Sequence, residues 1–70
     1  MSWNYRVVEH QYDDEESGYR IHEVYYDKDV PVAITEAGID LSGYSLDDLK
    51  SSFELIKLAF DKPVLKYEDF

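Results

Sequence analysis

The chain has 70 residues, no cysteine and a formal charge of −9, from seven basic and sixteen acidic side chains. Disulfides and cysteine zinc sites are therefore excluded as sources of stability, and the hydrophobic fraction of 44% is too high for a disordered acidic tail. The charge also argues against direct binding of nucleic acid, since phosphate contacts depend on Lys and Arg.

Three strands are expected in the first half of the chain, within a single domain of residues 1–70. The run W-N-Y-R-V alternates apolar and polar residues and predicts a strand over residues 3–10. After an acidic loop, aromatic and β-branched residues predict a second strand over residues 19–26. A third strand is expected over residues 32–36, and Pro31 beside it indicates a strand end or an edge strand.

One helix is expected over residues 46–61. Ser45 and Asp48 have the spacing of a capping box, in which a hydroxyl and a carboxylate satisfy free N–H groups. Pro63 ends the helix near its last predicted residue, and residues 66–70 are expected to be frayed. Spacings of three and four produce one apolar stripe, formed by Leu46, Leu49, Phe53, Ile56 and Phe60.

These elements predict an α+β fold: a three-stranded antiparallel β-meander with one C-terminal α-helix packed on one face, in the order β-β-β-α. The expected register places Arg6 opposite Glu23 and Val24 opposite Ile34. A slip of one residue would exchange the two faces of a strand. The side expected to face the helix consists of Trp3, Tyr5, Val7, Val24, Tyr26, Val32 and Ile34.

The other face of the predicted sheet is unusually apolar. One interpretation is that its side chains are scattered surface hydrophobes, which most proteins have. A second is that they form a partner surface, and a third is a small-ligand groove. We expect a protein–protein interaction domain that forms a homodimer through this open face, with an interface of Val8, Tyr19, Ile21 and Tyr25.

A weak candidate for a polar site lies at one edge of the predicted sheet. His22 is expected close to Glu36 and Glu9, and a histidine beside carboxylates can act as a general base or a metal ligand. The alternative is a structural histidine bonded to a cross-strand carboxylate. His10 is expected to lie too far from His22 to share a ligand. No catalytic motif is present, so we predict no enzyme, no catalytic residue, no metal and no cofactor.

The negative charge is concentrated between Glu9 and Asp29, where eight acidic residues and two basic ones carry −6 of the total −9. An acidic hairpin end can attract a basic protein partner, or it can serve solubility alone. The sequence shows neither a basic leader followed by an apolar stretch nor an apolar run of membrane-spanning length. A cytoplasmic protein without membrane contact is expected.

Three segments resemble a family of small uncharacterised bacterial proteins: W-N-Y-R-V at residues 3–7, I-H-E-V-Y-Y-D at 21–27 and D-K-P-V-L at 61–65. The resemblance implies a small bacterial cytosolic protein and no particular activity. More distantly, the β-β-β-α order and the segment G-Y-S-L-D-D-L at residues 43–49 resemble the core of HicB-type antitoxins. That likeness implies an inhibitor that binds a small basic ribonuclease, although no DNA-binding segment follows the core.

Overall fold

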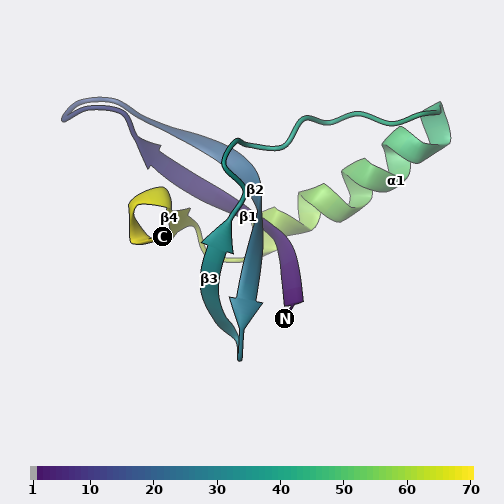
Figure 1. Cartoon of the computed structure of the whole chain (residues 1–70). Coiled ribbons are helices and arrows are strands. Elements are labelled where there is room, and N and C mark those ends of the chain that lie inside the picture. The colour runs from purple at the N-terminus through teal and green to yellow at the C-terminus, as the bar shows by residue number, and fades with distance from the viewer. Residues whose placement is uncertain (1) are drawn as a thin grey trace.

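A computed structural model describes residues 2–70 as one curled sheet with a helix that projects from it (Figure 1). The strands are β1 (Ser2–Gln11), β2 (Ser17–Asp27), β3 (Val30–Ile34) and β4 (Leu65–Lys66). The α-helix α1 (Leu46–Ile56) continues directly into the 3₁₀ helix η1 (Lys57–Asp61), and a second 3₁₀ helix, η2 (Tyr67–Asp69), follows β4. The strand order across the sheet is β3-β2-β1-β4.

The fourth strand makes the predicted three-stranded antiparallel meander wrong, although the α+β class is retained. β4 pairs with β1 in parallel, with Val8 opposite Leu65 and Glu9 opposite Lys66, so the sheet is mixed. Residues 66–70, which were expected to be frayed, instead form the end of β4 and η2. A strand of two residues has no periodicity, so its sequence contains no signal for the pairing.

The register between β1 and β2 differs from the prediction by one residue. Arg6 pairs with His22 rather than with Glu23, so every side chain of β2 lies on the other face from the one expected. Ile21 and Tyr25 therefore share a face with Tyr5, whereas His22 shares the opposite face with Val8. Hydrophobic residues occupy both faces of these strands, so the pattern alone did not distinguish the two registers.

The hairpin from β2 to β3 has a two-residue turn, shorter than the segment of residues 27–31 that the predicted strands leave between them. Lys28 and Asp29 have φ angles of 51° and 66°, which is the left-handed conformation that matches the twist of paired strands. Val24 pairs with Ile34, as predicted, and the register then shifts between Tyr25 and Tyr26. β3 lies at one edge of the sheet, which is the position that a strand containing proline requires.

The helix begins at Leu46, as predicted. The Ser45 side chain accepts a hydrogen bond from the Asp48 amide at 3.1 Å, and the Asp48 carboxylate accepts one from the Tyr44 amide at 3.0 Å. The α-helical part is shorter than predicted because the last turns, in η1, are 3₁₀. Lys62 is extended, with φ −119° and ψ 156°, as expected for a residue that precedes proline.

The position of the helix is not the one predicted. Instead of lying across the sheet, α1 extends away from it, and the connection from β3 runs out alongside to reach the helix start (Figure 1). No residue of α1 is buried, whereas Ala59 of η1 is fully buried. The fold therefore attaches the helix to the sheet only at its C-terminal end. No helix of residues 2–70 has the length and apolar character needed to cross a membrane.

The core is small and lies where η1 and η2 meet the sheet. Its buried apolar residues are Val7, Val8, Val24 and Ala59. Two polar side chains, those of Arg6 and His22, are buried with them. This is little apolar volume for a chain of this length, and the two buried polar groups must find partners inside the fold.

Candidate functional site

The most buried polar side chain is that of His22 in β2, which is 0% exposed. Its Nδ1 lies 3.0 Å from the Thr35 carbonyl oxygen and 3.1 Å from the Thr35 hydroxyl. Because a carbonyl only accepts, Nδ1 carries the proton and Nε2 offers a lone pair. The Nε2 atom of His10 lies 2.8 Å from the Nε2 atom of His22, so His10 is the donor in this contact.

The surroundings of His22 keep its ring neutral. Burial lowers the pKa of His22, and electrostatic repulsion from His10 and Arg20 lowers it further. The hydrogen bond to the Thr35 carbonyl acts in the opposite direction and raises the pKa, but burial has the larger effect. At neutral pH, His22 is therefore an uncharged acceptor for His10.

Aromatic rings cover the histidine pair. His10 stacks on Tyr67 of η2 with a centroid distance of 4.4 Å, and Tyr12 stacks on His10 at 6.2 Å. The two imidazoles themselves stack at 4.9 Å. His10 was expected to lie too far from His22 to share a ligand, and this placement was wrong, since the two rings are in direct contact. Both rings lie on one face of the hairpin and reach toward each other beneath Tyr67.

The carboxylates expected beside His22 are not its partners. Glu36 is exposed beyond the end of β3, and strand alternation puts Glu9 on the opposite face from His10. The hydrogen bonds of His22 go to Thr35 and His10 instead. Within residues 2–70, no group of three or more metal-ligating side chains is present. This arrangement links the strands to the C-terminal segment, which is a structural role.

The four residues predicted to form an interface do not share one surface. Val8 is 0% exposed on the face that also carries His22. Tyr19, Ile21 and Tyr25 lie on the opposite face, where Tyr19 is 62% exposed. Partial burial and the neighbouring Glu23 carboxylate raise the pKa of Tyr25, so its phenol stays protonated. Only these three remain available to a partner.

An apolar surface lies instead around the helix, whose stripe was expected to face the core. Phe60 is 70% exposed and Leu46 is 67% exposed, although both belong to the predicted buried stripe. We define the α1 face as the exposed apolar side chains of α1 and η1, of the loop before them and of the start of β1. These are Trp3, Leu41, Leu46, Phe53, Leu55, Leu58 and Phe60. The predicted stripe correctly indicated that the helix has an apolar face, but it did not identify the surface that covers this face.

Two apolar grooves run along this face, one on each side of the helix. The first has a volume of about 350 Å³ and lies between Ile21 of β2 and the helical side chains Phe53 and Phe60. The second has a volume of about 300 Å³ and lies between Tyr5 of β1 and Leu58. Both are lined mainly by hydrophobic side chains, as docking surfaces are.

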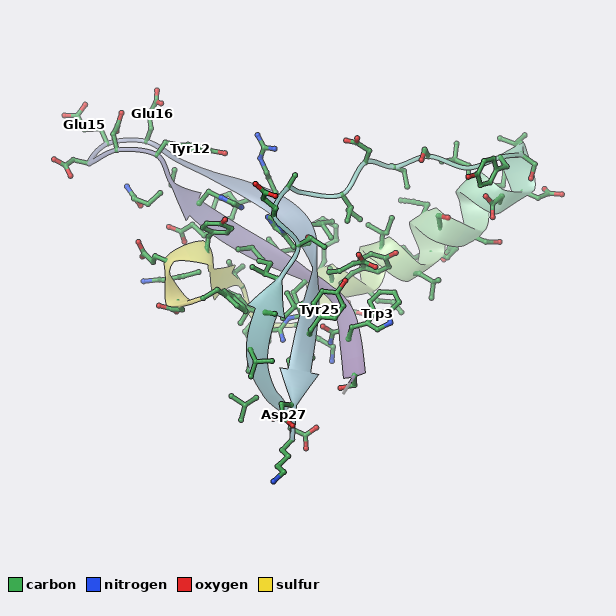
Figure 2. All side chains as sticks on the ribbon, viewed as in Figure 1. Trp3, Tyr12, Glu15, Glu16, Tyr25 and Asp27 are labelled. Atoms are coloured by element: carbon green, nitrogen blue, oxygen red, sulfur yellow. The ribbon has the colours of Figure 1, made fainter. Side chains whose placement is uncertain are left out.

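The acidic hairpin end lies far from the α1 face. Glu15 and Glu16 point outward at the tip of the long β1–β2 hairpin, while the helix occupies the other end of the molecule (Figure 2). Asp13 is used within the turn, where its carboxylate accepts hydrogen bonds from the Glu15 and Glu16 amides at 2.8 and 2.7 Å. Binding of a basic protein at this tip stays a prediction.

No known protein family, curated protein or solved structure matches this chain.

Proposed function

We propose that the protein is a self-associating interaction module, in which two copies bury their α1 faces against each other. The observation that carries this proposal is the exposed apolar helix beside two apolar grooves. A helix of an ordinary globular domain buries its apolar stripe in its own core. Here the stripe is presented outward, and a second copy supplies the surface that covers it.

The exposed area of the chain is larger than expected for a compact monomer, which supports a missing partner. The surface accessible to solvent is 5442 Å², whereas a folded monomer of 8.3 kDa is expected to expose about 4600 Å². The excess of roughly 850 Å² is close to the ~800 Å² that each partner buries in a standard interface. The radius of gyration of 13.0 Å likewise exceeds the ~11 Å of a compact domain of this length.

The small core supports the same conclusion. The four buried apolar side chains among residues 2–70 are few for a domain of this length, and no cysteine is available to compensate. In obligate homodimers, the folded monomer has little stability of its own, because the interface is part of the core. Burial of the α1 face in a dimer supplies this missing hydrophobic contact.

The distribution of charge also favours self-association at this end. Residues 45–70 carry six acidic and four basic side chains, which gives a net charge of −2, whereas residues 1–44 carry −7. Two copies that meet through the helical end keep their acidic hairpin tips apart (Figure 1). Contact through the hairpin end would bring like charges together at a cost in free energy.

Sedimentation velocity between low and high micromolar concentrations tests the proposal. We expect a dimer for the wild-type chain, and a monomer at high micromolar concentration would overturn it. Phe53→Glu places a charge in the first groove and should shift the equilibrium to monomer. Ser51→Glu adds the same charge at an exposed helix position that lines neither groove, and it should leave the dimer intact.

A second measurement keeps the proposal testable if Phe53→Glu does not fold. When folding is coupled to association, the midpoint of thermal unfolding rises with protein concentration. We expect this rise for the wild-type chain and for Ser51→Glu. A midpoint that is independent of concentration contradicts the dimer.

A further inference from the structure

A polar pocket of about 250 Å³ lies at the end of the sheet away from the hairpin tip, next to the start of β1. Its walls come from β1, from the end of β2 and its turn, and from the segment after η1. Its lining includes Trp3, Asn4, Arg6, Tyr26, Asp29 and Lys62. Unlike the two grooves of the α1 face, this pocket is predominantly polar.

Arg6 is a buried cation without an acidic partner. Its side chain is only 9% exposed, and its two terminal nitrogens donate to the Tyr26 hydroxyl at 2.8 Å and to the Pro63 carbonyl at 2.6 Å. Its Nε atom is buried and has no hydrogen-bond partner. Within residues 2–70, the only ion pair closer than 4.0 Å joins Lys57 to Glu54. A buried charge without a counter-charge is costly, so an anion beside Arg6 would stabilise it.

A second cation lines the same pocket. Lys62 comes from the segment that follows η1, and it is one of only seven basic residues in the chain. Two of these seven thus meet at one pocket in a protein with a net charge of −9. The amide of Asn4 and the hydroxyl of Tyr26 hydrogen-bond to each other at 2.8 Å and fix the polar wall beside Arg6.

We propose that this pocket binds a small oxyanion, a carboxylate or phosphate group, between Arg6 and Lys62. Charge-assisted hydrogen bonds from a guanidinium and an ammonium are the usual means of holding such groups. The volume suits a small metabolite and not a macromolecule. Asp29 lines the pocket as well, and its negative charge opposes the anion. The pocket adjoins the second groove and shares Trp3, Asn4 and Lys62 with it, whereas Arg6, Tyr26 and Asp29 line the pocket alone.

Trp3 provides a direct measurement, since it is the only tryptophan of the chain and lines the pocket. Its fluorescence is titrated with inorganic phosphate and, separately, with succinate, at fixed protein concentration. Sodium chloride at equal ionic strength corrects for screening. We expect a saturable change with at least one of the two anions, and the stronger response distinguishes a phosphate from a carboxylate ligand.

Substitutions at the rim identify the groups responsible. Lys62→Gln should weaken binding roughly two- to fivefold, because it removes one partly exposed charge contact. Asp29→Asn should strengthen binding, because it removes the opposing carboxylate. Lys66→Gln removes a similar charge outside this pocket and should leave the affinity unchanged. Arg6→Gln, once circular dichroism shows that it is folded, should abolish the saturable change.

Two results would overturn the proposal. One is a fluorescence change that is no larger in phosphate or succinate than in sodium chloride. The other is an equal loss of affinity in Lys62→Gln and Lys66→Gln, which would mean that the anion responds to overall charge and not to this pocket.

Discussion

The Nε2 atoms of His10 and His22 lie 2.8 Å apart, so only one proton fits between them. The Thr35 carbonyl fixes the other proton of His22 on Nδ1. A further proton on His22 Nε2 would charge a ring that is 0% exposed, and it would reverse the direction of this contact, since His10 Nε2 would then have to accept.

Stability should therefore fall with acid. The pKa of His22 is lowered in the folded chain from the value of 6.5 that it has in the unfolded chain. His22 therefore binds a proton more tightly in the unfolded chain than in the folded one. This stability is fully present above pH 6.5 and is lost as the pH falls toward the folded pKa, by at most ~1.4 kcal/mol per pH unit. Urea unfolding at pH 7.5 and 5.5, at one protein concentration, measures it.

The control for this prediction is His22→Gln, which removes the titrating group. Its free energy of unfolding should depend less on pH than that of the wild-type chain, since the proton that His22 takes up on unfolding no longer contributes. An equal pH dependence in both proteins argues against His22. Titration of the His22 ring protons by NMR gives the pKa in the folded chain directly, and a pKa at or above 6.5 would contradict the prediction.

Tyr26→Phe should destabilise the fold by about 1–3 kcal/mol. The Tyr26 hydroxyl accepts from Arg6 and donates to Asn4, both at 2.8 Å, so its loss leaves a second buried guanidinium donor without a partner. Tyr25→Phe is the matched control, because the Tyr25 hydroxyl makes only a long contact of 3.4 Å to Glu23. Urea unfolding compares the two variants, and equal losses would show that the Arg6 contact contributes nothing specific.

Gly43→Ala should cost about 1–3 kcal/mol. A Cβ atom at Gly43 would lie 2.6 Å from the backbone nitrogen of Leu49, so the loop would have to move away from the helix. Gly38→Ala is the comparison, because its Cβ would meet only side-chain atoms of Arg20, at 3.1 Å. A Gly43 variant as stable as the Gly38 variant would contradict the close packing of this loop on α1.

Ser45→Ala should reduce stability by roughly 1 kcal/mol, because the Asp48 amide loses the hydroxyl that caps it. The helical signal in circular dichroism should decrease with it, since few other contacts hold the start of α1. Ser51→Ala, at an exposed position inside the helix, should be neutral or slightly stabilising, because alanine has the higher helix propensity. The opposite order would exclude Ser45 as the cap.

The helix start, the three main strands and the edge position of β3 were predictable because each has a local signal. Ser45 and Asp48 indicated the helix start, and Pro31 indicated an edge. The pairing of Arg6 was not predictable, since residues on both faces of the hairpin are apolar and either register buries some of them. The stripe containing Phe53 and Phe60 showed that α1 is amphipathic, but a stripe contains no information on the surface that meets it.

The candidate sites were less predictable than the fold. His22 was named from the sequence as a polar-site candidate, but its neighbours depend on the register and on β4, so Thr35, His10 and Tyr67 take the place of Glu36 and Glu9. Arg6 was expected on a sheet face with Glu23, and its burial without a carboxylate follows from the same slip of one residue. Lys62 reaches that pocket only because the chain returns to β1 through Pro63.

The parallel pairing of β4 with β1 also determines when the fold can be completed. Pro63 and Arg6, which are joined by a hydrogen bond, are separated by 57 residues in the chain, and β4 pairs beside them. The β1–β2 hairpin needs only local contacts and can form early, whereas the sheet gains β4 only after residues 65–66 have been synthesised. Until then the edge of β1 is uncovered, and a nascent chain held in this state exposes a strand that can pair with another molecule.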